Sequence, residues 1–132
     1  MKKLVFIFFV TVLLIGCDAK KSNTDNLVGS WSVYKFTQNN ADRTTAFADS
    51  FPNYTIVFDA GGNFVESYSK PTLDTLIPDS VFIKGKWAFE NKYDYLTLTD
   101  TVFTSRKYAI YNLEAVHVEL RKDSESRYLR KN

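Results

Sequence analysis

Cysteine, histidine and methionine are almost absent from this chain of 132 residues, which contains one of each. A secreted domain held together by disulfides needs an even set of cysteines, so the single Cys17 excludes such a framework. A usual zinc site combines several histidine and cysteine ligands, which a lone His117 cannot supply. The sequence also lacks the Gly-x-Ser-x-Gly motif that presents a nucleophilic serine. These absences predict that the protein is not an enzyme and carries no cofactor or metal.

An excess of charge of one sign is also missing. The chain has 17 Lys and Arg residues and 15 Asp and Glu residues, but Lys2 and Lys3 precede the first hydrophobic run. Without these two lysines the charges balance, which argues against nucleic acid as a partner. We interpret a group of cations near the C-terminus as the solvated end of a strand: Arg121, Lys122, Arg127, Arg130 and Lys131.

The first residues have the three parts of a bacterial export signal. Lys2 and Lys3 give a positive start, residues 4–15 form an uncharged apolar run, and Gly16 is a small residue before the cleavage point. The run is too short to span a bilayer as a permanent helix, which needs about 20 residues. Its end, Leu14-Ile15-Gly16-Cys17, resembles the lipobox of bacterial lipoproteins.

In that family the cysteine is acylated, the peptide before it is removed, and the cysteine becomes the new N-terminus. The resemblance implies that Cys17 carries acyl chains such as palmitate, and two or more chains hold a protein durably on a membrane. It divides the sequence into a signal peptide (1–16), a lipidated cysteine with a polar tether (17–26) and one domain (27–132). We expect a monomer in the bacterial cell envelope, on the periplasmic face of the outer membrane. Asp18 retains some lipoproteins at the inner membrane, so the choice of membrane stays open.

After residue 27 the hydrophobic residues recur with a period of two. Ile83, Gly85 and Trp87, for example, alternate with Lys84 and Lys86. This alternation is typical of strands with one face in a core and the other in water. It predicts eight strands, at residues 28–37, 53–59, 63–69, 81–90, 94–100, 105–112, 115–122 and 126–131, with a turn or two of helix over 44–50.

The connections between these strands alternate between short turns and long loops. Residues 60–62, 91–93 and 113–114 form short turns, whereas 38–52 and 71–80 are long loops. In an up-and-down meander, alternate connections fall at opposite ends of the sheet. A sheet of this size avoids exposed edges by closing. We therefore predict an all-β fold, an eight-stranded antiparallel up-and-down barrel with tight turns at one end and long loops at the other.

Two copies of Gly-x-Trp strengthen this prediction. Gly29-Ser30-Trp31 opens the first strand and Gly85-Lys86-Trp87 lies in the fourth. With the lipobox and the hairpin over 58–62, they resemble the small lipocalin-like domains of bacterial lipoproteins over residues 27–131. In the lipocalin family the Trp plugs the closed end of the barrel and an Arg of the last strand packs across it. The resemblance assigns these barrel-closing roles to Gly29, Trp31 and Arg130, with Arg127 as the second choice for the arginine.

The predicted inward side chains are large and often aromatic. They suit either an apolar pocket with hydroxyls that orient a ligand or, because the domain is shorter than typical lipocalins, a solid core. They are Tyr54, Ile56, Phe58, Phe64, Tyr68, Ile83, Trp87, Leu98, Tyr108 and Ile110. Glu66 points inward if Phe64 and Tyr68 do, and a carboxylate inside a barrel needs a partner. It could then orient a polar ligand head together with Tyr54 or Tyr108. We favour the alternative, in which the strand bulges or puts Val65 inward and leaves Glu66 in water.

The long loops contain apolar residues without a strand pattern, which could form a lid or a partner surface. These are Phe47, Phe51, Leu76 and Ile77. We expect a non-catalytic lipoprotein that binds a small apolar or amphipathic ligand at the end bearing these loops. The alternative is a solid barrel whose loops contact an envelope protein or inhibit an enzyme. A cavity would favour the first hypothesis, and a filled interior with an exposed apolar patch would favour the second. The sequence names neither the ligand, nor the partner, nor the pathway.

Overall fold

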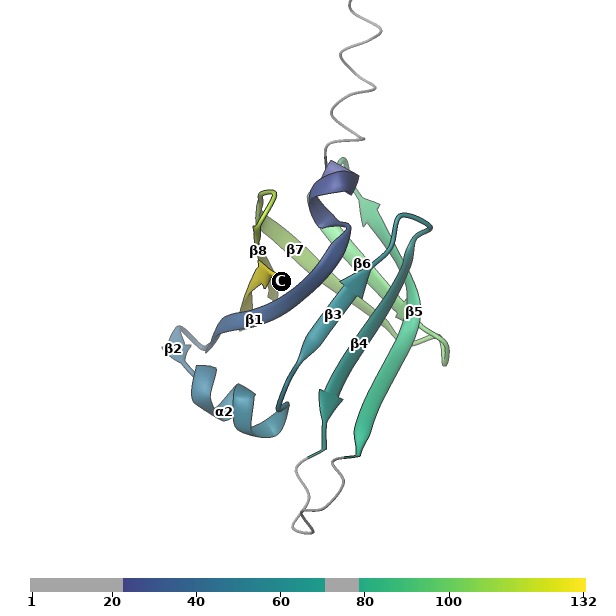
Figure 1. Ribbon diagram of the computed structural model, residues 1–132. Helices are drawn as coiled ribbons and strands as arrows, with labels where there is room; N and C mark the ends of the chain where they lie inside the picture. Colours follow the sequence, from purple (N-terminus) through teal and green to yellow (C-terminus); the bar gives the residue numbers. More distant parts are fainter. Residues whose placement is uncertain (1–22, 71–78) are drawn as a thin grey trace, which may run out of the picture.

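Strands occupy most of the chain from Gly29 to Lys131 (Figure 1). The computed structural model describes residues 23–70 and 79–132. A helical turn over residues 23–27 comes first. The elements that follow are β1 (Gly29–Gln38), β2 (Ala41–Asp42), α2 (Thr44–Ser50), β3 (Thr55–Phe58), β4 (Asn63–Ser69), β5 (Ser80–Glu90), β6 (Tyr95–Asp100), β7 (Ser105–Leu113), β8 (His117–Lys122) and β9 (Glu125–Lys131).

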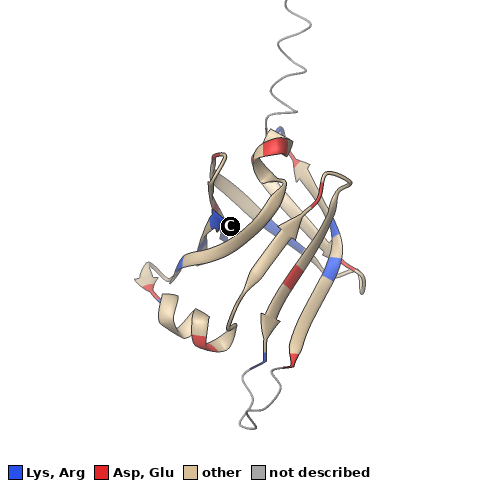
Figure 2. Ribbon diagram, in the orientation of Figure 1, with Lys and Arg blue, Asp and Glu red and all other residues tan. Residues whose placement is uncertain are grey.

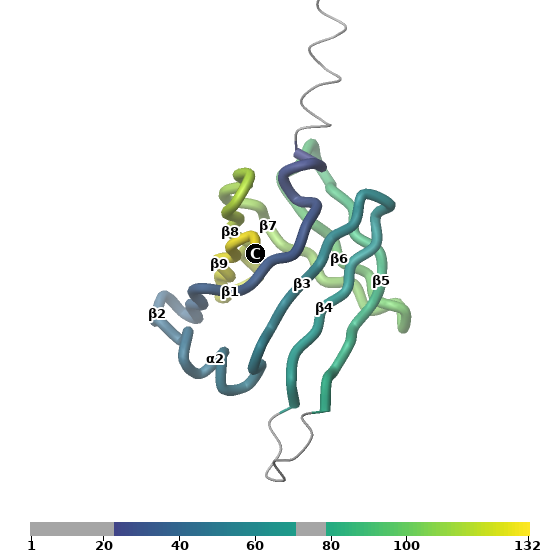
Figure 3. Tube along the Cα trace, in the orientation of Figure 1, coloured from purple at the N-terminus to yellow at the C-terminus, as the bar shows by residue number. Residues whose placement is uncertain are grey.

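The sheet closes on itself through its first and last long strands. Every long strand is antiparallel to its neighbours, and β1 pairs with β9 along most of its length. Figure 3 shows the last strand returning to lie beside β1. The two-residue β2 only pairs with the end of β1, so eight strands form the wall. The predicted eight-stranded up-and-down barrel is confirmed, and each predicted strand and the helix over 44–50 agree with the structure to within two residues.

The long connections lie at one end of the barrel, as the loop lengths predicted, but the prediction that all tight turns lie at the other end is wrong. The β6–β7 turn and the two-residue β8–β9 turn lie at the same end as the long loops. The tight turns β3–β4, β5–β6 and β7–β8 lie at the end where the N-terminal segment enters (Figure 1). At the opposite end lie α2 and the ends of β4 and β5 that lead to residues 71–78. We call the end where the N-terminal segment enters the closed end, and the opposite end the open end.

The closed half of the barrel is a solid apolar core. Trp31 is 0% exposed, and its Nε1 donates a hydrogen bond to the Leu27 carbonyl oxygen at 2.7 Å, so residues 23–27 cover this end. The side chains that pack with it come from most strands of the wall: Leu27, Ile56, Phe58, Phe64, Leu96, Leu98, Val118, Leu120 and Leu129. Each fully buried aliphatic or aromatic side chain contributes about 1.5–3 kcal/mol, which makes this cluster the main source of stability in a chain without disulfides.

The cation that covers Trp31 comes from Lys131, and the role predicted for Arg130 is wrong. Lys131 Nζ lies 4.9 Å from the Trp31 ring centroid and donates to the carbonyl oxygens of Asn26 (2.8 Å) and Val28 (2.9 Å). Trp31 pairs with Lys131 across β1 and β9, so both point inward, whereas Arg130 points outward. Gly29, at φ 139°, leaves room for the lysine stem, whose Cε would lie 3.2 Å from a Cβ there.

The cations near the C-terminus are not all solvated as predicted, because strand alternation divides them between two faces. Arg127 lies inside the barrel with Lys131. Arg130 lies over the Tyr34 ring at 5.0 Å and Arg121 over the Tyr111 ring at 3.6 Å, both on the outer face. These four side chains therefore form no common basic patch.

Gly85, in the second Gly-x-Trp, lies where β6 passes closest to β5. A Cβ at this position would lie 2.0 Å from the Thr99 carbonyl oxygen and 2.7 Å from the Asp100 Cα. We predict that Gly85→Ala lowers the free energy of unfolding by about 1–3 kcal/mol, because the backbone of β6 must move. Urea unfolding followed by tryptophan fluorescence measures the change. Gly61→Ala is the control, since a Cβ there would meet only side-chain atoms at 3.3 Å. An equal loss in both variants would contradict the prediction.

Candidate ligand-binding site

A carboxylate lies inside the open half of the barrel. Glu66 on β4 is 2% exposed and is the one acidic residue of that strand, visible as its red segment in Figure 2. β4 pairs with β3 and β5 without a bulge, so Glu66 keeps the inward direction of Phe64. Our interpretation that a bulge leaves Glu66 in water is therefore wrong.

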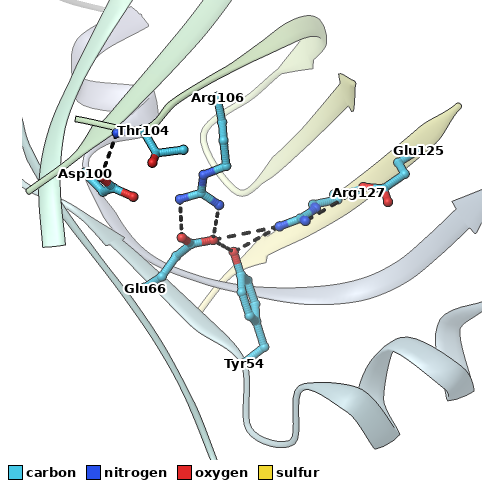
Figure 4. Close-up of polar contacts among 7 residues, drawn as sticks. All are labelled: Tyr54, Glu66, Asp100, Thr104, Arg106, Glu125 and Arg127. Atoms are coloured by element: carbon cyan, nitrogen blue, oxygen red, sulfur yellow. Dashed lines mark hydrogen bonds and ion pairs between the residues drawn. The ribbon is translucent and has the colours of Figure 1, made fainter. Parts of the chain in front are cut away.

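Glu66 is held by a two-pronged contact with Arg106 on β7 (Figure 4). Arg106 Nη1 donates to Glu66 Oε1 at 3.0 Å, and Nη2 donates to Oε2. Burial by itself would lower the pKa of Arg106, but the hydrogen bonds and the negative charge of Glu66 outweigh it, so the pKa is raised above its ordinary value. Both partners are charged, and each largely neutralises the other.

Tyr54 and Arg127 complete the cluster around Glu66. Tyr54 Oη donates to Glu66 Oε1 at 2.5 Å, and Arg127 Nη1 donates to Tyr54 Oη at 3.4 Å. Burial, and then the negative charge of Glu66, raise the pKa of Tyr54 well above its usual value. The hydroxyl therefore stays protonated at neutral pH and remains a donor to the carboxylate.

Arg127 is bound less completely than Arg106. Its Nη1 lies 3.8 Å from Glu66 Oε1, and its Nη2 lies 3.9 Å from Glu125 Oε2 at the rim. Its Nε is buried and has no hydrogen-bond partner among the described residues. Rings of Phe47, Tyr54 and Tyr108 surround the guanidinium at 5.6–5.9 Å from its centre. Arg127 is thus a partly buried cation, 18% exposed in its side chain, with unused hydrogen-bonding capacity at Nε.

Two hollows meet at this cluster. The inner one has a volume of about 150 Å³ and is lined by Phe47, Phe51, Tyr54, Glu66, Tyr68, Ile83, Arg106 and Arg127. The outer one has a volume of about 390 Å³ and is lined by Phe36, Gln38, Arg43, Ala46, Phe47, Ser50, Phe51, Glu125 and Arg127. Phe47, Phe51 and Arg127 belong to both, so they form the partition between the barrel interior and the outer face of α2.

α2 places this partition across the open end. Phe47 is buried and its ring packs on Phe36 (4.8 Å between centroids), Phe51 (5.0 Å) and Tyr54 (5.4 Å). The Phe51 ring meets Tyr68 edge-on at 5.0 Å. Phe47 and Phe51 therefore lie where the loop analysis predicted, while Leu76 and Ile77 fall outside the described residues.

The structure separates the predicted inward residues into distinct groups. Ile56, Phe58, Phe64 and Leu98 belong to the solid core of the closed half. Tyr54, Tyr68 and Ile83 line the inner hollow, and Tyr108 packs beside Arg127.

Trp87 and Ile110 are half-buried against the core rather than part of the hollow. Trp87 Nε1 donates to the Asp59 carbonyl oxygen at 3.0 Å, which ties the ring to the β3–β4 hairpin. The two residues therefore support the wall of the barrel on the closed side of the cluster.

Sequence analysis missed Arg106 and Arg127 as partners of Glu66. The signal was strand alternation, because Arg106 precedes the inward Tyr108 by two residues and Arg127 precedes the inward Leu129 by two. A buried carboxylate requires a compensating charge, so inward arginines on other strands were the residues to seek.

The fold and the site are those of a lipocalin-like binding barrel, and the comparisons agree. A family model described as a lipocalin-like domain matches residues 27–115, and the chain belongs to this family. The family is typically non-catalytic. No protein with a curated description matches the sequence.

Solved structures from Bacteroides share this fold. A lipocalin-like protein from Bacteroides uniformis is 10% identical, with a TM-score of 0.59 over 81% of this chain and 99% of that one. An uncharacterized protein from Bacteroides eggerthii is 12% identical, with a TM-score of 0.57 over 80% of this chain and 99% of that one. Identities this low show a common fold and nothing about a ligand.

The described residues were also compared with two simple requirements, those of a membrane-spanning helix and of a metal site. Within residues 23–70 and 79–132, no helix is long and apolar enough to cross a membrane. The same residues contain no group of three or more His, Cys, Asp or Glu side chains placed to hold a metal ion.

Removing the Glu66 carboxylate should destabilise the protein strongly. We predict that Glu66→Ala lowers the free energy of unfolding by about 3 kcal/mol or more, because Arg106 and Arg127 remain buried without an anion. Glu90→Ala is the matched control, since Glu90 pairs with Lys107 at 2.7 Å in a pair whose side chains are 44% and 52% exposed. That change should cost less than about 1 kcal/mol. Urea unfolding of both variants tests this, and similar small losses would contradict it.

Proposed function

We propose that this protein is a lipid-anchored binding protein of the bacterial envelope that takes a small amphipathic ligand at its open end and catalyses no reaction. One observation carries the proposal. The closed half of the barrel is filled with apolar side chains, yet the open half keeps a polar hollow around Glu66, Arg106 and Arg127. Replacing a buried ion pair by apolar side chains is often neutral or stabilising. Stability alone therefore does not account for this cluster, whereas ligand recognition does.

The size of the hollows supports binding in which α2 takes part. Pockets for small molecules usually measure about 300–1,000 Å³, more than the inner hollow of about 150 Å³. Displacing the Phe47 ring would join this hollow to the outer one of about 390 Å³. α2 has seven residues and lies outside the strand wall, and the Thr44 amide at its start donates to Asp42 Oδ1 at 2.9 Å. Such an element opens at lower free energy than the barrel wall.

The proposed anchor at Cys17 predicts which end of the barrel faces away from the membrane. The described chain enters the barrel at the closed end, and Cys17 precedes that point in the sequence (Figure 1). Attachment to a membrane through Cys17 would leave the open end facing away from the bilayer. In this arrangement the ligand reaches α2 from the aqueous side of the envelope.

An exposed aromatic side chain in the β6–β7 turn supports a second candidate, a protein-interaction function. Phe47 is buried, so it offers no apolar patch to a partner. Phe103 in the β6–β7 turn is 89% exposed, and its φ of 62° is one that bulky residues rarely adopt. Asp100 Oδ1 holds the turn by accepting hydrogen bonds from the Val102 and Thr104 amides at 3.0 and 2.9 Å. A second candidate function is therefore contact with an envelope protein through this turn.

Native mass spectrometry tests the ligand proposal. The chain from Asp18 onward, which contains every strand of the barrel, is purified from an envelope extract and should carry a bound small molecule. We predict that Ile83→Phe, which fills the inner hollow, abolishes the bound mass. Phe82→Trp is the control, because residue 82 is the exposed neighbour on the outer face. A wild-type chain that stays empty, and captures nothing from a mixture of envelope lipids and metabolites, would refute the proposal.

Mass spectrometry of the membrane fraction tests the anchor. We predict that the mature chain begins at Cys17 and carries acyl chains, because Leu14-Ile15-Gly16-Cys17 has the lipobox pattern. Cys17→Ala should move the protein out of the detergent-soluble membrane fraction and remove the acyl mass, since one or no acyl chain anchors weakly. Ser22→Ala in the polar tether is the control. Cleavage at another position, with a free Cys17 thiol, would contradict the prediction.

A further inference from the structure

The charges that face the inner hollow do not cancel. Its lining contains one carboxylate, Glu66, and two guanidinium groups, Arg106 and Arg127. Burial, and then the negative charge of Glu66, raise the pKa of Tyr54 well above its usual value, so its hydroxyl adds no charge. Glu125 lies at the outer rim, 3.9 Å from Arg127 and one-third exposed, where solvent weakens its attraction. The interior therefore keeps about one uncompensated positive charge.

That charge belongs to Arg127. Arg106 donates two hydrogen bonds, one to each oxygen of the Glu66 carboxylate. Arg127 makes one long hydrogen bond, to Tyr54 Oη at 3.4 Å, and its buried Nε has no partner among the described residues. A buried donor without an acceptor is costly and rare in native proteins. An acceptor that arrives with a ligand would remove this cost.

Arg127 lines both hollows, on each side of the Phe47 ring. Arg43 is a second cation of the outer hollow, but Arg127 also borders the Glu66 cluster. The rings of Phe47, Tyr54 and Tyr108 limit the water around the guanidinium, which strengthens an ion pair formed there.

We propose that the head of the ligand is a carboxylate that receives hydrogen bonds from the Nε and an Nη of Arg127, an inference that rests on the proposed function. The planar fork of arginine matches the two oxygens of a carboxylate. Glu66 Oε1 lies 3.8 Å from Arg127, so a head with two negative charges would meet about twice the repulsion that a single charge meets. The ligand is thus a small amphipathic monoanion.

The outer hollow takes the apolar part of this ligand. Phe36, Ala46, Phe47 and Phe51 supply the apolar part of its lining, and Gln38, Arg43, Ser50, Glu125 and Arg127 supply the polar part. With the carboxylate at Arg127, a short hydrocarbon chain extends past Phe47 along this lining. Glu66, Arg106 and Tyr54 act as positioning residues, because they hold the hydroxyl and the charges around Arg127 without being the main donors to the ligand.

Isothermal titration with octanoate, octanol and octyl phosphate tests the proposal on the chain from Asp18 onward. We expect octanoate to bind about tenfold or more tighter than octanol, the difference that a charge-assisted hydrogen bond provides. Octyl phosphate should bind more weakly than octanoate. Arg127→Met should reduce octanoate to the affinity of octanol. Arg130→Met, on the same strand but over Tyr34 on the outer face, should leave all three affinities unchanged.

The wild-type chain supplies a readout that does not depend on the folding of a variant. The Nε–H resonance of Arg127 should shift on addition of octanoate and stay in place with octanol. Equal affinities for octanoate and octanol, with no shift, would overturn the carboxylate assignment and leave the proposed binding function standing. Binding of none of the three probes would overturn both. If Arg127→Met does not fold, Arg127→Lys takes its place in the titration. This variant should retain less than half of the preference for octanoate over octanol. Full retention of that preference would contradict the role of the planar guanidinium group.

Discussion

The antiparallel pairing of β1 with β9 is the constraint on which the rest of this structure depends. It turns a meander into a closed wall and removes the two edges that an open sheet would expose. Because side chains alternate across a strand, its register also decides which residues of β9 face the interior. It directs Lys131 onto Trp31 at the closed end and Arg127 beneath Phe47 at the open end. Stability and the candidate site therefore follow from the same pairing.

The closed half and the open half of the barrel interior are packed differently. The closed half is dry and solid, with Trp31 capped by Leu27 and Lys131, and it supplies the burial that a chain without disulfides needs. The open half keeps a hollow and a charged cluster, and in the described part of the chain α2 covers it. A site held by side chains of rigid strands keeps its geometry better than one built on loops. An anchor at the closed end would leave α2 unobstructed.

The Glu66 cluster connects the wall to the site. Glu66, Arg106 and Arg127 come from β4, β7 and β9, and Tyr54 directly precedes β3, so the cluster exists only when the barrel is closed. Arg106 neutralises Glu66, and this leaves Arg127 as the cation with capacity to spare. The shared fold of the Bacteroides structures, at 10–12% identity, gives no reason to expect the same cluster there. The comparisons therefore give the fold of this barrel and leave the role of its cluster to be argued from its own residues.

The sequence by itself determined the strands, their order and the end that carries the long loops, because alternation and loop length are local properties that survive in any packing. It also placed Trp31 in the plug and Tyr54, Tyr68 and Ile83 on the inner face. Only the tertiary structure decided that a bulge between Val33 and Lys35 turns Phe36 inward and Lys35 outward. It likewise decided that Lys131 rather than Arg130 covers Trp31, and that Arg106 and Arg127 surround Glu66. These outcomes depend on register between strands far apart in the chain, where a shift of one residue exchanges inside for outside, and no local pattern encodes it.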